Sequence, residues 1–400
     1  MEEEEQRLDH PSLHLLSAVL ALEPSESLIS YARVCGGGSI TEQVQKFIWD
    51  HCLSKAASSQ LFTTLYADFN APYLKSFLKK LITEVELERG HALDNLYELY
   101  AQYMTSIKDN SLVKSDARIC KRISFLFPDG FSELQSCPHS RVLVFPLQCS
   151  LNMLEGDTGC SIWPSSLFLS ELILSYPELF SNKSCFEIGS GVGLVGICLA
   201  HVKASKVILS DGDLSTLANL KFNLELNHLS VEFEMGERNK NLSMVKCMYL
   251  PWESASESQL QDIMPDVVLG ADVIYDPVCL PHLVRVITIL LTDTKSYTCR
   301  QNASCGGLSP NTEHEDGDLN DSNRHNCNDG SDSRQKEAPV AYIACVVRNV
   351  DTFNCFLSLV EQAKLEIMDL TGSLKPVNLL PYMQSYNQAS IRLLRITCIH

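Results

Sequence analysis

The residues best suited to chemistry lie in one glycine-rich stretch, Cys185-Phe-Glu-Ile-Gly-Ser-Gly-Val-Gly-Leu-Val-Gly196. A strand-like run leads into this stretch, and a helix-like apolar run follows it. Glycine permits a tight turn and lets a ligand approach the backbone closely. Gly191, Gly193 and Gly196 also satisfy the G-x-G-x-x-G spacing of dinucleotide-binding loops. We therefore expect a strand, a ligand-binding turn and a helix, although a turn without a ligand gives the same pattern.

Two cofactor classes fit such a turn. A nicotinamide dinucleotide places its pyrophosphate at the helix N-terminus, where an ionised Glu187 gives no help. S-adenosylmethionine has no phosphate but carries an ammonium group and a sulfonium, which an acidic residue two positions before Gly189 favours, directly or through water. Asp211 follows Gly189 by 22 residues and closes the next predicted strand, where it is placed to accept hydrogen bonds from ribose hydroxyls. Glu187 favours S-adenosylmethionine, and the nicotinamide alternative stays open.

A second candidate group follows the apolar run Asp266–Gly270, which ends in Asp272-Val-Ile-Tyr275. In open α/β sheets, ligands bind at the carboxyl ends of the strands. We expect Asp272 and Tyr275 to project toward the ligand of the glycine turn. The alternative is that Asp272 caps the next helix and that Tyr275 packs in the core.

Two of the three tryptophans, Trp163 and Trp252, lie close to predicted strands. Each indole has a flat face suited to an adenine or to a pocket wall, and each is equally suited to filling the core. Their position beside strand ends favours the pocket.

The surrounding pattern alternates between strands and helices, which is typical of a largely parallel sheet with helices on both faces. Helices are predicted at Leu214–Leu226 and Leu280–Leu291. The predicted strands of this sheet are Ser184–Ile188, Lys206–Ser210, Met244–Leu250, Asp266–Gly270, Val340–Val347, Leu365–Leu370 and Ser390–Cys398. Two further short strands are predicted at Ile123–Phe127 and Arg141–Phe145.

Residues 10 to about 110 show helical periodicity instead. Leu74, Phe77, Leu78, Leu81, Ile82 and Val85 follow the spacing of one buried helical stripe. We expect a helical N-terminal region at 1–112, serving as a scaffold or docking module, and an α/β domain at 113–400.

The composition limits the class of protein. The chain has 400 residues, of which 45% are hydrophobic, so it is long and apolar enough to bury a core. Its net charge of −17 disfavours non-specific binding to nucleic acid. The N-terminal Met-Glu-Glu-Glu-Glu lacks the features of a secretory or mitochondrial leader, and no apolar stretch approaches the ~20 residues of a membrane span. We expect a soluble, cytosolic protein without membrane contacts.

Because the sequence shows no secretory signal, we expect the sixteen cysteines to stay reduced. They include no C-x-x-C pair, so we expect no metal site. Most cysteines lie in apolar runs and are expected in the core, among them Cys185, Cys198, Cys345 and Cys355. An acidic insert is expected at about 294–338. Within it, 311–338 carries eight acidic and three basic residues and one large aliphatic residue, which predicts a disordered loop.

These motifs resemble those of the seven-β-strand protein-lysine methyltransferases. The resemblance rests on Thr158-Gly159…Trp163, on Glu187-Ile-Gly-Ser-Gly-Val-Gly193, on Trp252 and on Asp272-Val-Ile-Tyr275. Within that group the chain is most similar to the family of eukaryotic elongation factor two lysine N-methyltransferases. That finer resemblance rests on Tyr73–Leu81, Leu93–Tyr100, Val347-Arg-Asn349 and Leu380-Pro-Tyr382. Two positions depart from the family pattern, because Pro164 and Pro251 stand where acidic residues are common.

The resemblance implies a Rossmann-like, seven-stranded class I methyltransferase sheet and transfer of a methyl group from S-adenosylmethionine to a lysine. It assigns Asp272 to orienting the amine and Tyr275 to walling the channel. The implied cofactor-binding residues are Trp163, Glu187, Gly189, Ser190, Gly191, Gly193, Asp211, Trp252 and Ala271. The implied partner is a protein, elongation factor two, and the enzyme is expected to act as a monomer. The alternatives are methylation of another protein, a nicotinamide oxidoreductase, and an inactive adaptor, which the presence of Asp272 and Tyr275 disfavours.

Overall fold

The computed structural model describes residues 8–53, 71–106, 118–128, 142–150, 158–230, 244–292 and 338–399. The acidic insert expected at 294–338 lies outside these residues, apart from Ala338. The predicted boundary between 112 and 113 also lies outside them.

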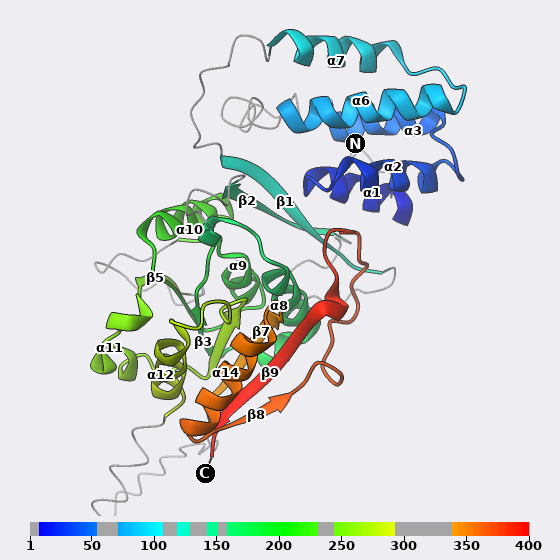
Figure 1. The fold of residues 1–400 in the computed structure, drawn as a ribbon. Coiled ribbons are helices and arrows are strands. Elements are labelled where there is room, and N and C mark those ends of the chain that lie inside the picture. The colour runs from blue at the N-terminus through cyan, green and yellow to red at the C-terminus, as the bar shows by residue number, and fades with distance from the viewer. Residues whose placement is uncertain are drawn as a thin grey trace, which may run out of the picture.

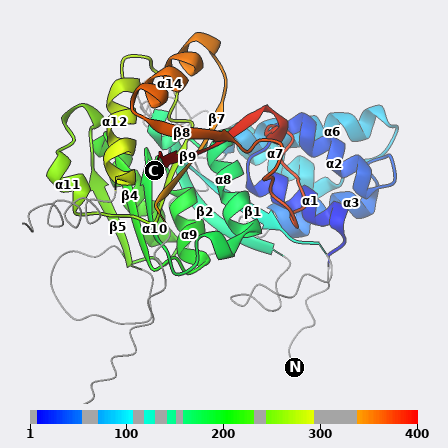
Figure 2. The ribbon, with the colours of Figure 1, turned by 90° about the horizontal axis from the view of Figure 1, so that it is seen from below.

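The N-terminal region is helical, as predicted. Its elements are α1 (His10–Leu20), α2 (Ser25–Cys35), α3 (Glu42–Phe47), the π-helical turn η1 (Ile48–Leu53), α6 (Ala71–Leu87) and α7 (Asp94–Ser106). Asp9 caps α1 by accepting the Ser12 N–H, and Thr41 caps α3. Along α6, Phe77, Leu78 and Leu81 are fully buried, so the predicted stripe is the packed face. These helices lie to one side of the rest of the molecule (Figures 1 and 2).

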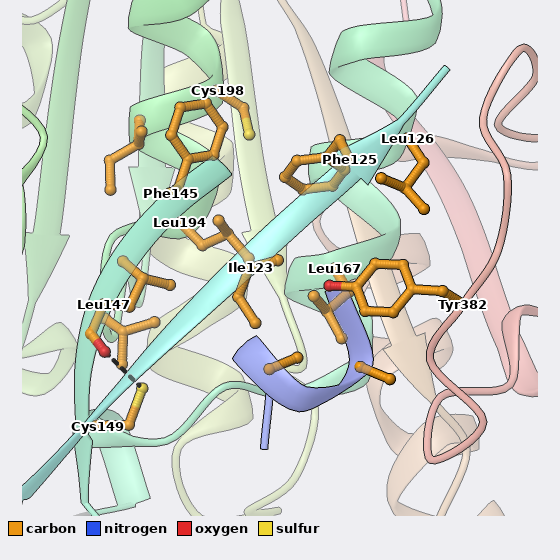
Figure 3. Close-up of a cluster of buried hydrophobic side chains, with 14 of the residues drawn as sticks. Ile123, Phe125, Leu126, Phe145, Leu147, Cys149, Leu167, Leu194, Cys198 and Tyr382 are labelled. Carbon is orange, nitrogen blue, oxygen red and sulfur yellow. Dashed lines mark hydrogen bonds between the residues drawn. The ribbon is translucent and has the colours of Figure 1, made fainter. Parts of the chain in front are cut away.

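An antiparallel ribbon connects the two parts of the chain. Its strands are β1 (Arg118–Leu126) and β2 (Val142–Ser150), paired along their full length from Arg118↔Ser150 to Leu126↔Val142. Both predicted short strands are confirmed and are longer than expected. Figure 3 shows Ile123 and Phe145 of this ribbon packed near Leu167 and Leu194 of the α/β part.

The main sheet has seven strands in the order β5-β4-β3-β6-β7-β9-β8. β3 to β7 are parallel, and β9 runs antiparallel to both of its neighbours. Counted within this sheet the order is 3-2-1-4-5-7-6, the class I methyltransferase arrangement that was predicted. The strands are β3 (Ser184–Ile188), β4 (Lys206–Asp211), β5 (Met244–Tyr249), β6 (Val267–Ala271), β7 (Val340–Val346), β8 (Leu365–Asp369) and β9 (Ile391–Cys398).

Helices cover both faces of the sheet, and alternate strand residues are therefore buried in two separate clusters. On β3, Cys185 packs with one cluster, and Phe186 and Ile188 pack with the other. The first cluster includes α8 (Pro164–Ser175), α9 (Leu194–His201) and α10 (Leu214–Leu226). The second includes α11 (Glu257–Gln261), α12 (Leu280–Leu291) and α14 (Val350–Gln362). Short turns complete the fold: η3 (Thr158–Cys160), η4 (Pro177–Leu179), η5 (Trp252–Ser254) and η6 (Gln388–Ser390).

The segment 370–390, here called the strap, joins the two parts. The Tyr31 hydroxyl donates to the Tyr382 carbonyl at 2.6 Å, and the Tyr382 hydroxyl accepts the Ser124 N–H at 3.0 Å. The buried carboxylate of Glu23 accepts the N–H of Ser385 at 3.0 Å. Buried residues of α1 belong to the same apolar cluster as those of α8 and α9. The helical region is therefore packed on the α/β part.

Most of the described cysteines are buried, among them Cys185, Cys198 and Cys345, as predicted. The prediction for Cys355 is wrong, since this residue is exposed on α14. The buried residues of α14 are Thr352, Phe356 and Val360, one turn apart, and Cys355 lies off that line. None of the helices among the described residues is long and apolar enough to cross a bilayer.

Candidate active site

A cavity of about 480 Å³ opens at the carboxyl ends of the central parallel strands. Eight of the eleven predicted site residues line it: Trp163, Gly189, Gly191, Asp211, Trp252, Ala271, Asp272 and Tyr275. Glu187, Ser190 and Gly193 do not line it. Most of the residues predicted from the sequence therefore lie in one cavity. The local surroundings of the other three explain why they do not line it.

The glycine turn has left-handed backbone at three positions, with φ of 66° at Gly189, 52° at Gly191 and 88° at Gly193. A Cβ on Gly191 would lie 2.9 Å from the carbonyl oxygen of Gly159. A Cβ on Gly193 would lie 2.3 Å from Leu220 on α10. Gly189 and Gly191 thus form part of the cavity wall, whereas Gly193 allows the turn to pack against α10.

Ser190 is part of the turn, and Glu187 lies beneath it in β3. The Ser190 N–H donates to the Ser210 carbonyl at 2.8 Å, which ties the turn to β4. Glu187 is 1% exposed, and its Oε2 has no hydrogen-bond partner among the described residues. Burial, with a smaller contribution from Asp211, raises the pKa of Glu187 well above its ordinary value. The prediction assumed an ionised Glu187, whereas these surroundings disfavour the ionised carboxyl unless a cation comes near.

Asp211 ends β4 at the cavity wall. Its Oδ2 accepts the N–H of Gly191 at 3.1 Å, and its Oδ1 accepts the N–H of Asp213 at 3.1 Å. Burial raises its pKa, and these two hydrogen bonds oppose the effect. Each carboxylate oxygen keeps a second lone pair, so the predicted role toward ribose hydroxyls remains chemically available.

Asp272 follows β6 with a φ of 55°, a conformation that Asp tolerates better than most residues. Its Oδ1 accepts the Val346 N–H at 3.0 Å and pairs with Arg348 Nη1 at 3.2 Å. Its Oδ2 accepts the Ser165 N–H at 3.3 Å, near the start of α8. The alternative prediction was that Asp272 caps the next helix. Its carboxylate does accept an N–H group at the start of a helix, but the helix is α8 and not the one that follows Asp272.

Tyr275 is 62% exposed at the cavity, so the alternative that it packs in the core is wrong. Trp163 precedes α8, and its Nε1 donates to the Thr158 carbonyl at 2.9 Å. A Cβ on Gly189 would lie 3.6 Å from Cζ2 of Trp252, which places that indole against the glycine turn. Both indoles therefore belong to the pocket and not to a closed core.

The two departures from the family pattern have local explanations. Pro164 is the first residue of α8, where proline fits because its missing N–H has no helical partner to lose. Pro251 precedes η5 and lines the cavity. Neither substitution displaces the neighbouring tryptophan from the pocket.

The sequence prediction of the site missed Arg348, Glu253 and Cys279, all of which line the cavity. The Cys279 Sγ lies 3.5 Å from Glu253 Oε1 and 3.6 Å from Asp276 Oδ2. Desolvation and these carboxylates raise the pKa of the thiol to about 11, so it stays protonated and is not a nucleophile. Arg348 follows β7, and two signals could have found it: its position at a strand end and its place in the Val347-Arg-Asn349 motif.

The charges at this cavity suit a cationic ligand. Asp211, Asp213, Glu253 and Asp272 line it, and Arg348 is the one Lys or Arg among the described residues that do so. The unpaired Oε2 of Glu187 lies beneath the same turn. A pyrophosphate would be repelled here, whereas a sulfonium and an ammonium group would be attracted. The residues present therefore fit S-adenosylmethionine.

Comparisons with known proteins agree with this chemistry. A family described as "Lysine methyltransferase" matches residues 146–304. The protein-lysine N-methyltransferase EEF2KMT of Mus musculus is 27% identical over 308 residues, covering 76% of this chain and 74% of the relative. Its Homo sapiens counterpart is 27% identical over 322 residues, covering 80% and 79%. Over most of its length the chain is therefore similar to protein-lysine methyltransferases.

The chain also matches a calmodulin-lysine N-methyltransferase of Arabidopsis thaliana, 31% identical over 135 residues, or 34% of this chain and 41% of the relative. Among solved structures, a precorrin-6y C5,15-methyltransferase from Geobacter metallireducens covers 59% of this chain and 86% of its own. Its identity is 12% and its TM-score 0.30, too low to establish a shared fold. These similarities identify an enzyme of the protein-lysine N-methyltransferase type with S-adenosylmethionine as its cofactor, and they decide against the nicotinamide alternative.

Proposed function

We propose that this lysine methyltransferase methylates a lysine of eukaryotic elongation factor two in the cytoplasm, acting as a monomer. The observation that carries the proposal is the length of the similarity to the two EEF2KMT relatives. Their alignments span 308 and 322 residues, whereas the methyltransferase family itself accounts for residues 146–304. The similarity therefore extends well beyond the methyltransferase segment. The calmodulin-lysine relative aligns over 135 residues and offers no such extension.

In this proposal, Gly189, Gly191 and Asp211 hold the cofactor at one wall of the cavity, with Ser190 fixing the turn beneath. Trp163, Trp252 and Ala271 supply the remaining walls. When bound, S-adenosylmethionine supplies an electrophilic methyl group on a positively charged sulfur. The chain's own residues position the acceptor and exclude bulk water from the reacting atoms.

The acceptor is a lysine amine, which reacts only when neutral. Its nitrogen lone pair forms the new bond to the methyl carbon as the carbon–sulfur bond breaks, and that bond's electrons stay on sulfur. The proton leaves nitrogen for solvent. A near-attack distance of ~3 Å is needed. Tyr275, exposed at the cavity, narrows the approach, and Asp272 has about one acceptor position left for an amine hydrogen after its three existing donors.

The helical N-terminal region serves in this proposal as a platform for the large protein substrate. Tyr97 and Met104 on α7 are each 40% exposed, and α7 lies away from the sheet in Figure 1. Because α1 shares its core with α8 and α9, removal of the region would damage the fold, and a surface substitution is the better test. Met104→Glu should raise KM for the protein substrate about threefold with kcat unchanged. Met368→Glu, at an exposed residue of β8, is the matched control and should change neither.

The decisive test offers purified elongation factor two, lacking its native modification, to the full-length protein with labelled S-adenosylmethionine. Calmodulin is offered in parallel at equal concentration. The expected result is label on a lysine of the factor, located by mass spectrometry, and none on calmodulin. Label on calmodulin, or on another protein of a cell extract while the factor stays unlabelled, would overturn the proposed substrate.

A further inference from the structure

Three side chains from distant parts of the chain meet at one edge of the cavity. The guanidinium carbon of Arg348 lies 5.1 Å from the centre of the Trp163 ring, a cation–π contact. The same guanidinium pairs with Asp272 at 3.2 Å. Asp272 is nearly buried, with 4% of its side chain exposed, whereas 43% of the Arg348 side chain is exposed. The cation is therefore held by a buried carboxylate and an indole, and it still faces the cavity.

The backbone on both sides of Arg348 is fixed. Val346, at the end of β7, donates its N–H to Asp272. Asn349 caps α14 by accepting the N–H groups of Asp351 and Thr352. Arg348 is held between these two anchors, so its position relative to the cavity is set by the fold and not by its side chain alone.

The charge of Arg348 bears on the acceptor amine. A carboxylate beside an amine favours the ammonium form, and a nearby cation favours the neutral form. The titratable or charged residues lining the cavity are Asp211, Asp213, Glu253, Asp272, Tyr275, Cys279 and Arg348, with Glu187 buried beneath. On the adjacent strand β9, Arg392 is paired with Asp369 at 2.9 Å. The lining carboxylates therefore favour a protonated substrate lysine, and the charge of Arg348 opposes them.

We propose that Arg348 is a positioning residue for methyl transfer, which neutralises Asp272 and keeps the acceptor lysine in its neutral, nucleophilic form. This inference rests on the proposed lysine acceptor in the same cavity. Arg348 does not take part in the bond changes: the amine proton still goes to solvent, and the new carbon–nitrogen bond still forms from the amine lone pair. Arg348 sets the fraction of substrate that is able to react.

The test compares pH profiles of kcat for Arg348→Gln and Arg348→Lys with that of the unmodified protein. Arg348→Gln should move the midpoint up by about one pH unit, cut the rate about tenfold near pH 7, and recover at high pH. Arg348→Lys keeps the charge and should keep the midpoint. The double variant Asp272→Asn/Arg348→Gln removes both charges and should return the midpoint toward its original value. Equal rate loss at every pH, or equal impairment by Lys and Gln, would show a purely structural bridge and overturn the proposal.

A second measurement is independent of turnover. S-adenosylmethionine and S-adenosylhomocysteine differ in the charge on sulfur, so removal of a nearby cation should favour the first selectively. Calorimetry on Arg348→Gln should show the Kd of S-adenosylmethionine falling about threefold relative to that of S-adenosylhomocysteine, with no change in Arg348→Lys. An unchanged ratio overturns the proposal whatever the activity. The ratio can also change while the unmodified enzyme transfers label to no protein. That result overturns the proposed function and leaves the electrostatic effect of Arg348 established.

Discussion

A buried glutamate and a partly buried one mark two regions of the molecule that handle charge in opposite ways. Glu187, beneath the glycine turn, has an oxygen without any partner among the described residues. Glu171, on α8 under the strap, accepts hydrogen bonds at Oε2 from the Tyr386 hydroxyl at 3.0 Å and from the Gln388 amide. Burial raises the pKa of both carboxyls, that of Glu171 to about 7.

The difference shows what each region is for. A fold usually satisfies its buried polar groups, so an unsatisfied carboxyl beside a cavity indicates a site completed by a ligand. Under the strap the chain itself supplies two donors to Oε2 of Glu171, and these hydrogen bonds tie the strap to α8. The four predictions below test which polar groups need a bound ligand and which are satisfied by the chain itself. They run from the largest expected effect to the smallest.

The largest effect is expected from Gly191→Arg. Its backbone is left-handed and a Cβ meets the Gly159 carbonyl at 2.9 Å, so the new side chain strains the turn and enters the cavity with positive charge. Cofactor affinity should fall more than a hundredfold, about 3 kcal/mol, and the melting temperature by a few degrees. The matched control is Gly372→Arg, where no atom lies within 4 Å of a Cβ. Near-normal affinity in the Gly191 variant, measured by calorimetry, would remove the turn from the site.

The second effect is a pH dependence set by Glu171. Because its folded pKa is raised from 4.5 to about 7, the folded state binds this proton more tightly than the unfolded chain does. Stability from this group is therefore complete below pH 4.5 and is lost as pH rises toward 7, in total ~3 kcal/mol. Glu171→Gln keeps an oxygen acceptor and cannot ionise, so it should match the unmodified protein at pH 5 and exceed its stability at pH 8. Denaturant unfolding at both pH values measures this, and parallel curves would contradict it.

The third effect concerns Glu187→Gln. Since the buried carboxyl is costly to ionise, the amide should leave the melting temperature unchanged or raise it. Cofactor affinity should fall about tenfold, because the carboxyl can ionise beside a cationic ligand and the amide cannot. Calorimetry in two buffers of different ionisation enthalpy should show proton release on binding for the unmodified protein and none for the variant. If the variant and the unmodified protein show the same cofactor affinity and the same proton release, Glu187 does not interact with the cofactor.

The smallest effect is expected from Tyr31→Phe. The substitution removes the hydrogen bond from α2 to the Tyr382 carbonyl and the side-chain hydrogen bond with Gln384, both of which end in the strap. We expect a loss of about 1 kcal/mol, seen as a melting temperature lower by about 1 to 3 °C. Cofactor affinity should stay the same, and a change in it would show that the strap communicates with the cavity.

Much of the fold was predictable, since short apolar runs between turns mark buried parallel strands. β3 was predicted with its observed bounds, and the other strands of the main sheet came within about one residue at each end. Helices α10 and α12 were also predicted with their observed bounds. Local patterns determine such elements, so one sequence carries enough information to find them.

The contacts that complete the site were less predictable. Asp272 receives hydrogen bonds from Ser165 and from Val346, and these partners are 107 and 74 residues away in sequence. Arg348 acquires a role only because β7 ends beside the start of α8. The exposure of Tyr275 and the burial of Glu187 also follow from tertiary packing, which no local pattern encodes.

The position of β9 has a consequence for the order of folding. Within the described sheet β8 pairs only with β9, and β9 also forms the second edge of β7, so β8 cannot join the sheet until residues up to Cys398 are available. The strap, which precedes β9, carries the partner of Tyr31 from 351 residues further along the chain. During synthesis on the ribosome, the contacts of the N-terminal helices with the strap can therefore form only after these late residues emerge, and contacts of such long sequence separation slow folding.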